Sequence, residues 1–427
     1  MTFREHLLNF LPKEEVESLL SSLNEEDQHA VLLNTKFISD EEFLSLYPNV
    51  KPHPYVKHAY IYDKNEYPLG KSIYHELGCF YLQEPSAMIV SSLIPFEEDD
   101  FVLDLCAAPG GKTIQASLKM NGNGLIISND LSKSRAFLIT NNLERLGLAN
   151  VIVTNNDFKD IHELYLNKFD KIILDAPCSG SGMFRKEDKM INDWSINKVY
   201  KFAEIQKEII LYAYKMLKPG GLLSYSTCSY SQEEDEEVIE YLLKNSDAEI
   251  SPLPVLKDAY INPNNPIGVR FMPNHFHGEG QYICHIKKPG VSEKTSFIHE
   301  NKYHKVLPSF LNEYHIEKYG DTYFGLINGI SYKKLNIIRP GMKILEEIKG
   351  IPHYNLHFAR SISKDNFPQI DLDLEQAKTY LSGEVLRYQN NQKDYVLLTY
   401  KNKPIDIAKT DGLLIKNNYP KGLRKKF

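Results

Sequence analysis

The sequence has few cysteines, and none of them stands in a spacing that marks a zinc site or a disulfide framework. The five cysteines among 427 residues are scattered and never form CxxC, which favours a reducing compartment. A run of about 18 apolar residues, the length that spans a bilayer, is absent. The first residues, MTFREHLLNF, are not a basic segment followed by an apolar one. We therefore expect a soluble, cytoplasmic protein that does not bind a membrane.

The sequence motifs of two kinds of nucleotide-binding site, and of a metal site, are missing as well. Residues 104–113, DLCAAPGGKT, lack the GxGxxG of a dinucleotide site and the first glycine of a P-loop. His275 and His277 have no third ligand at metal spacing. We expect neither a dinucleotide nor a metal ion.

The chain also has no overall excess of positive charge. Its net charge of −6 argues against a generic polyanion binder. The distribution is uneven, because residues 1–50 carry ten acidic and three basic side chains, whereas the last twelve residues, KNNYPKGLRKKF, carry five basic ones and no acidic one. This asymmetry permits a nucleic-acid surface, although a basic terminus is often only a solvated tail.

Residues 101–288 alternate between short apolar segments and amphipathic ones. Five segments have the pattern of buried strands: FVLDL, LIISND, VIVTNND, KIILDA and LLSYS. Helical patterns lie between them, and QYICHIKK reads as an antiparallel closing strand. Strands that are apolar on both faces and alternate with helices predict a doubly wound parallel sheet, a Rossmann-like α/β fold.

The regions before and after this segment differ from it in composition and in the spacing of their apolar residues. Residues 1–50 read as helices, since VESLLSSL and EEFLSLY repeat apolar residues three and four apart. Pro85 or Ser86 can open a further helix. After Pro289 the chain becomes rich in Lys and Tyr and ends in strand-like segments, which predicts an α+β or β-barrel module. We divide the chain into an α-rich N-terminal domain, 1–90, a core, 91–290, and a C-terminal region, 291–427.

Three aspartates stand at the ends of consecutive predicted strands of the core, namely Asp130, Asp157 and Asp175. Ligands of doubly wound sheets bind beyond the carboxyl ends of the strands. Gly110 and Gly111 let the backbone approach a ligand before a helix whose N-terminus favours an anionic group. A nucleoside without a pyrophosphate, S-adenosylmethionine, fits these features best. The alternative for any one aspartate is that it caps a turn.

Two stretches carry one cysteine each just past a predicted strand: FDKIILDAPCSGSG, residues 169–182, and GLLSYSTCSY, residues 221–230. If the two strands are neighbours, about 4.8 Å apart, their turns can bring Cys178 and Cys228 to one substrate. The alternative, a small buried hydrophobe, is the usual fate of a free cysteine. Position alone supports the pair and does not decide which thiol attacks.

The same stretches resemble the signature blocks of a known family. VLDLCAAPGGKT, FDKIILDAPCSGSGMFRK and GGLLSYSTCSYSQEEDEEVI are similar to those of the RNA 5-methylcytosine methyltransferases, the Fmu/Sun or NOL/NOP/Sun family. The end of the chain, with YLSGEVLRY and NNYPKGLRKKF, resembles the RNA-binding end of the branch that modifies the ribosomal small subunit. The resemblance covers residues 50–427 and implies an accessory RNA-binding role for the N-terminal domain and a PUA-like RNA-binding C-terminal region.

The resemblance also implies residue roles. Cys228 is the nucleophile, Cys178 assists product release, and Asp175 lies between cofactor and target base. Asp130 binds the ribose and Asp157 the adenine of S-adenosylmethionine. The remaining contacts to the cofactor fall on Cys106, Ala107, Ala108, Pro109, Gly110, Gly111, Lys112 and Arg135. Asp235 departs from the family, which often has Asn there in an acidic run that we expect to lie off the catalytic turn.

The implied chemistry explains why two thiols and a carboxyl are needed. Carbon 5 of cytosine is a weak nucleophile until a thiolate adds to carbon 6. A nearby base must then remove the proton from carbon 5, and a second cysteine can do so. The base must be unstacked to react. Candidates for stacking and phosphate contact follow the first cysteine turn, and the alternative for each is ordinary core or surface: Phe184, Arg185, Lys186 and Trp194.

We therefore expect a monomeric methyltransferase that acts on RNA, most readily 16S rRNA or the small ribosomal subunit, and not on DNA. A tRNA cytosine methyltransferase remains an alternative. Another is an RNA-binding ribosome assembly factor that keeps the fold without catalysis. A small-molecule methyltransferase would leave the extra modules unexplained.

Overall fold

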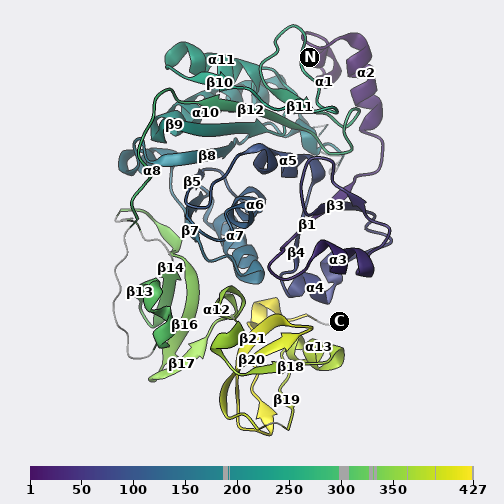
Figure 1. Cartoon of the computed structure of the whole chain (residues 1–427). Coiled ribbons are helices and arrows are strands. Elements are labelled where there is room, and N and C mark those ends of the chain that lie inside the picture. Colours follow the sequence, from purple (N-terminus) through teal and green to yellow (C-terminus); the bar gives the residue numbers. More distant parts are fainter. Residues whose placement is uncertain are drawn as a thin grey trace.

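The structure is a computed structural model that describes residues 1–185, 191, 193–297, 307–326, 330, 334–362, 364–389 and 391–425. A nine-stranded sheet forms its centre, with the order β10-β12-β9-β8-β5-β6-β7-β15 and with β11 beside β12 (Figure 1). The parallel strands are β5 (Phe101–Asp104), β6 (Leu125–Asn129), β7 (Val151–Thr154), β8 (Phe169–Asp175) and β9 (Leu217–Thr227). The antiparallel strands are β10 (Glu249–Ser251), β11 (Val269–Phe271), β12 (Gln281–Lys287) and β15 (Ile337–Arg339).

Helices cover both faces of this sheet, which confirms the doubly wound fold. The helices of one face are α5 (Pro85–Leu93), α6 (Gly111–Lys119) and α7 (Lys133–Leu146), and those of the other are α8 (Phe158–Leu164), α10 (Ile196–Met216) and α11 (Glu236–Asn245). Strand β5 shows why both faces are covered: Phe101 and Leu103 pack with α8 and α10, while Val102 packs with α6 and α7. α7 ends at Gly147 in the left-handed conformation, as its sequence predicts.

The N-terminal region contains the predicted helices and, in addition, a four-stranded antiparallel sheet. Its helices are α1 (Phe3–Leu7), α2 (Lys13–Ser22), α3 (Asp40–Leu46), α4 (Ile73–Glu76) and the short η1 (Leu69–Lys71). Its strands, in the order β2-β3-β1-β4, are β1 (His29–Leu33), β2 (Lys51–Pro52), β3 (Ala59–Tyr62) and β4 (Phe80–Gln83). Strand β1 lies within residues 1–50, so the prediction of helices alone was wrong there. Its five residues are too few to show a period.

The C-terminal region holds two further sheets. The first has the order β13 (His315–Tyr319), β14 (Thr322–Leu326), β16 (Met342–Ile348), β17 (Ile351–Tyr354). The second has the order β18 (Gln369–Asp371), β20 (Asp394–Tyr400), β21 (Lys403–Thr410), β22 (Leu414–Ile415), β19 (Leu386–Arg387). The helical elements are α12 (Leu356–Ser361), α13 (Leu374–Ser382), η3 (Ser309–Glu313), η4 (Lys364–Asn366) and η5 (Lys421–Leu423). Because β15 of this region pairs with β7, the region also completes the central sheet.

The N-terminal and C-terminal regions share one hydrophobic core. Phe43 and Phe80 belong to the same buried cluster as Tyr380, Val396 and Tyr419. Figure 1 shows the sheet that contains β18, β20 and β21 beside α3 and α4. The boundaries at 90 and 290 stay a prediction. None of the helices that the structure describes is long and apolar enough to cross a membrane.

Candidate active site

The predicted site residues lie at the edge where the parallel strands end. β8 and β9 are neighbours, with Asp175 opposite Ser226, and β5 lies on the other side of β8. Since parallel strands end at one edge, the turns that follow β5, β8 and β9 lie together. The sheet order therefore meets the condition on which the pairing of the two cysteine turns depended.

The loop after β5 has the backbone geometry of a ligand cradle. Gly110 adopts the left-handed conformation (φ 105°) and precedes α6, and a Cβ atom added there would lie 3.2 Å from the Ile139 side chain. No side chain caps α6, so the amides of its first turn can bind an anionic group such as an amino-acid carboxylate. Cys106 is partly buried, and burial raises the pKa of its thiol. It packs beside the loop as a neutral group.

Asp130, just after β6, and Arg135, in the first turn of α7, hold this loop. The Asp130 carboxylate accepts hydrogen bonds from the amides of Ala108 (3.2 Å) and Ser132 (2.8 Å). Arg135 donates to the carbonyl of Ala108 (2.9 Å) and lies 3.6 Å from Asp130. Both predicted residues are therefore at the loop. The buried Asp130 is also a carboxylate acceptor of the kind that ribose hydroxyls require.

Asp157 has the alternative role that its position allowed. It caps α8 by accepting a hydrogen bond from the amide of Lys159 (2.9 Å). It stands at the end of β7, two strands from β5 in the same sheet. Its predicted contact with adenine stays a prediction.

Lys112 and Asp175 form an ion pair in the centre of the site. The Lys112 Nζ lies 2.7 Å from Asp175 Oδ2, and the nearby carboxylate raises the pKa of Lys112 although burial opposes this shift. The other oxygen of Asp175 accepts hydrogen bonds from Ser226 (2.7 Å) and Gln281 (2.9 Å). About a third of the Asp175 side chain is exposed, so the carboxylate can still meet a ligand.

The two predicted thiols lie side by side. The Sγ atoms of Cys178 and Cys228 are 3.1 Å apart, and both residues are partly exposed free cysteines. The hydrogen bond with Cys228, together with burial, raises the pKa of Cys178 well above its usual range. Cys79 and Cys284, in contrast, are 0% and 1% exposed. The structure thus brings together the pair that the sequence singled out.

An acidic run behind the turns was misplaced by the sequence analysis. Asp235 does not lie off the catalytic turn, because it accepts a hydrogen bond from Thr227, the residue before Cys228 (2.6 Å). Asp235 and Glu236 both pair with the buried Arg270 of β11. Gln281 and Glu234 also bond to site residues and were not singled out. The only signal for Glu234 in the sequence was its place in an acidic run next to a catalytic motif, and Gln281 had no such signal.

The candidates for stacking on a base have other partners. Phe184 is 2% exposed and packs edge-on against Phe3 at 5.0 Å, and Trp194 packs against the same ring at 5.3 Å. The stacking prediction is therefore wrong for Phe184, which has no exposed face. Arg185 donates to the carbonyl of Gly278 (3.1 Å). Lys186 lies outside the described residues.

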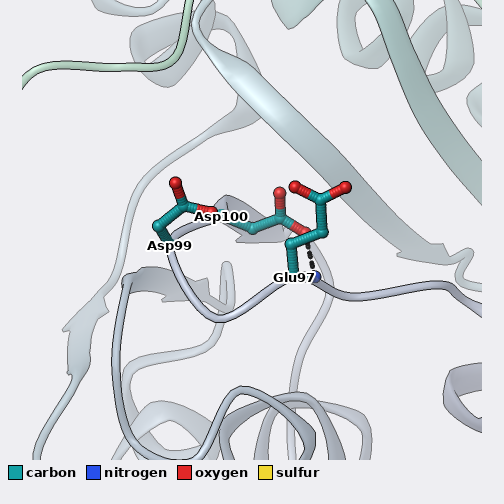
Figure 2. A group of neighbouring side chains, drawn as sticks. All are labelled: Glu97, Asp99 and Asp100. Carbon is teal, nitrogen blue, oxygen red and sulfur yellow. Dashed lines mark hydrogen bonds between the residues drawn. The ribbon is translucent and has the colours of Figure 1, made fainter.

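Within the described part of the chain, one group of carboxylates has the proximity of a metal site: Glu97, Asp99 and Asp100 (Figure 2). Lys294 already donates to Glu97 (2.6 Å) and to Asp99 (2.7 Å), so a cation is present in the cluster. The cluster precedes β5, at the opposite end of the strand from the site. His275, for which the sequence offers no third ligand at metal spacing, forms a hydrogen bond with Glu15 (2.8 Å).

Family models match three parts of the chain. A family model of the 16S rRNA methyltransferases RsmB/F matches residues 91–287. A model of the N-terminal domain of 16S rRNA methyltransferase RsmF matches residues 1–85, and a model of the methyltransferase RsmF PUA domain matches residues 367–425.

Individual relatives extend over similar lengths. The ribosomal RNA small subunit methyltransferase F of Psychromonas ingrahamii is 32% identical, over 83% of this chain and 81% of its own. The protein of the same name from Vibrio vulnificus is 27% identical, over 99% and 97%. A solved methyltransferase homologue from Pyrococcus horikoshii is 29% identical (TM-score 0.59, 66% of this chain and 93% of that one). NSun6 of the same organism, solved with SFG, shares the fold at 22% identity (TM-score 0.61, 67% and 98%).

Proposed function

Since this chain belongs to the ribosomal RNA small subunit methyltransferase F family, whose members are S-adenosylmethionine-dependent, we propose that it methylates carbon 5 of a cytosine in 16S rRNA through a covalent bond from Cys228 to carbon 6. The observation that carries the proposal is the 3.1 Å approach of Cys178 and Cys228 beside the Asp175 carboxylate. Catalysis by one thiol alone, or by one carboxylate alone, would not require two sulfurs and a carboxylate to lie together.

The residues of the loop suit S-adenosylmethionine. The uncapped start of α6 and Lys112 offer positive partners to an amino-acid carboxylate, while Asp130 offers acceptors to a ribose. Pro109, Gly110 and Gly111 keep the loop backbone close to the ligand. When bound, S-adenosylmethionine supplies the methyl group. We assign Asp157 to the adenine amine. Its Oδ1 continues to cap α8 through the amide of Lys159, which leaves Oδ2 for the adenine.

The first step is attack by Cys228. Its electron pair forms the bond to carbon 6 of the cytosine, and the ring gains an enamine that makes carbon 5 nucleophilic. Charge builds on ring nitrogen 3, where Asp175, held by Lys112, Ser226 and Gln281, is positioned to share a proton or hydrogen bond. Cys178 keeps its own proton at this stage, because its hydrogen bond to the neighbouring sulfur raises its pKa.

The second step is release. Once the Cys228 sulfur is bonded to carbon, it carries no charge, so the negative neighbour that disfavours the Cys178 thiolate is gone. Cys178 can then give its proton to water and use the electron pair left on sulfur to take the proton from carbon 5. The electron pair of that C–H bond restores the ring double bond and expels the Cys228 thiolate. The two thiols thus have unequal roles, in attack and in release.

The C-terminal region is assigned to RNA binding, as its PUA family model suggests. We further assign the protein to RNA and not DNA, to the monomeric state and to the cytoplasm. The alternative substrate, tRNA, is tested by the experiment below, as is the alternative of an assembly factor without catalysis.

Mutation of each thiol tests the proposal. With labelled S-adenosylmethionine and undermodified 16S rRNA, small subunits or tRNA, Cys228→Ala should abolish methyl transfer. Cys178→Ala should accumulate a covalent protein–RNA adduct on a denaturing gel. Bisulfite sequencing of total RNA with and without the protein then locates the cytosine. An adduct that forms in Cys228→Ala and never in Cys178→Ala would reverse the two roles, and cofactor binding without transfer to any RNA would favour the assembly factor.

A further inference from the structure

Each catalytic cysteine is followed by a serine, and the two Cys-Ser pairs lie against each other. The sulfurs of Cys178 and Cys228 are 3.1 Å apart, and the hydroxyls of Ser179 and Ser229 are 3.4 Å apart. Both serines are buried, whereas both cysteines are partly exposed. The sulfurs thus remain accessible while the hydroxyls lie in the interior.

One buried carboxylate binds both serines. Glu234 is 0% exposed, and its Oε2 accepts hydrogen bonds from the hydroxyls of Ser179 (2.5 Å) and Ser229 (2.6 Å). Its Oε1 accepts from the amide of Ser179 (2.7 Å) and from Gln206 (3.1 Å). Because hydrogen bonds to an ionised acceptor are about twice as strong as neutral ones, this carboxylate is a strong link between the two turns.

Glu234 differs from its acidic neighbours in its partners. Asp235 and Glu236 are compensated by Arg270, whereas no lysine or arginine in the described part of the chain forms a salt bridge with Glu234. Burial raises the pKa of Glu234, which shows that a carboxylate at this place is costly. Four hydrogen bonds from the turns and from α10 offset that cost. Its partners are therefore the catalytic turns themselves.

We propose that Glu234 is a positioning residue, whose carboxylate joins Ser179 to Ser229 and thereby sets the distance between the Cys178 and Cys228 sulfurs. Other bonds also join the turns, such as the bond from the amide of Gly182 to the carbonyl of Cys228 (2.6 Å). Loss of Glu234 therefore loosens the Cys-Ser pairs while the turns stay in place. The consequence for catalysis, slower release of the covalent intermediate, rests on the proposed function. The effect on the distance between the two sulfurs does not depend on that function.

The relative placement of the two sulfurs can be tested without RNA or S-adenosylmethionine, through the ease with which they form a disulfide. In glutathione redox buffers the two thiols lose two protons and two electrons to form a disulfide, and glutathione disulfide takes them up as two thiols. The equilibrium gives the effective concentration of one thiol for the other. Peptide mass spectrometry identifies the 178–228 disulfide among the other cysteines. Methyl transfer by the wild-type protein is measured separately, so a failure of the proposed function leaves this result intact.

The decisive variant is Glu234→Gln, and the matched control is Glu237→Gln, which lies three residues further along the chain, in the first turn of α11. We expect the effective concentration to fall at least tenfold in Glu234→Gln and to stay within twofold of wild type in Glu237→Gln. Ser229→Ala removes only one of the four bonds and should give a smaller fall; it decides the question if Glu234→Gln does not fold. A wild-type value in both variants, or a wild-type protein that forms no 178–228 disulfide, overturns the proposal.

A catalytic measurement separates positioning from general stability. In single turnovers, Glu234→Gln should lengthen the lifetime of the covalent RNA adduct at least tenfold, while the Kd for S-adenosylmethionine stays within twofold. Equal losses in cofactor binding and in adduct turnover would indicate a general loss of structure, and would overturn the proposal.

Discussion

Lys112 Nζ and Asp175 Oδ2 lie 2.7 Å apart, and this ion pair joins the first turn of α6 to the end of β8. Lys112 follows the loop assigned to the cofactor, and Asp175 ends the strand that leads into the Cys178 turn. A change in either residue should therefore affect the proposed junction between cofactor and target base.

The first prediction concerns this junction. Asp175→Asn keeps the shape of the side chain but cannot pass a proton to ring nitrogen 3, and it also loses the charge that binds Lys112. We expect kcat for methyl transfer to fall by about 100-fold, the scale of lost acid–base assistance. The KM for S-adenosylmethionine should change much less. Steady-state kinetics with labelled cofactor measure both values, and a change in KM alone would contradict the role of Asp175 at the base.

The second prediction concerns the cofactor loop. Asp130→Ala removes the acceptor for the amides of Ala108 and Ser132 and the carboxylate proposed for the ribose. Since a hydrogen bond to a charged group contributes about 1.5–3 kcal/mol, the Kd for S-adenosylmethionine should rise at least about tenfold. Isothermal titration calorimetry measures the Kd. Asp160→Ala, on α8, is a control that should leave it unchanged.

The third prediction concerns the reactivity of the cysteines. Brief treatment with iodoacetamide near neutral pH should alkylate Cys228 first. Cys228 is partly exposed, and the pKa values of the two other partly exposed thiols, Cys106 and Cys178, are raised. Cys79 and Cys284 should stay unmodified, because burial raises both pKa values to about 12. Peptide mass spectrometry gives the order of modification. Early labelling of Cys79 or Cys284 in the native protein would contradict the burial of these thiols.

The fourth prediction is a pH dependence of stability. Burial raises the pKa of Asp104 from an ordinary value of 3.8 to about 7. Between these values the folded chain binds more protons than the unfolded chain, so this contribution to stability is present below pH 3.8 and is lost as the pH rises through about 7.

The variant Asp104→Asn does not titrate and isolates this contribution. The free energy of unfolding of Asp104→Asn minus that of the wild type should increase with pH, by up to about 4 kcal/mol from acid to mildly alkaline solution. Urea unfolding of both proteins across this range measures the difference. The buried Asp406 has a similarly raised pKa but is present in both proteins and cancels. A constant difference would contradict the prediction.

The parts of the fold that the sequence predicted depend on local signals. The strands of the central sheet alternate with helices that end at residues such as Gly147, so period and turn chemistry sufficed. The thiol pair could be predicted because parallel neighbours end at one edge. The residues behind the thiols could not, because their partners are distant: Arg270 lies 34 positions from Glu236. A buried charge has no local pattern that distinguishes it from an exposed one.

Short strands were missed for a related reason. β1 has five residues and β15 has three, and each is stabilised by the strands with which it pairs: β1 by β3 and β4, and β15 by β7. The stacking prediction for Phe184 failed because α1, from the other end of the chain, covers it. Packing between distant segments decides such cases.

The core that the two ends of the molecule share has a consequence for biosynthesis. Phe43 and Phe80 leave the ribosome early, but their buried neighbours Tyr380 and Tyr419 are made last. At about 5–20 residues per second, the early apolar surface waits on the order of 20–70 s for its cover. The N-terminal sheet therefore completes its packing only when translation is nearly finished. An RNA methyltransferase of this design spends most of its own synthesis with its N-terminal region partly uncovered, where chaperones can bind it.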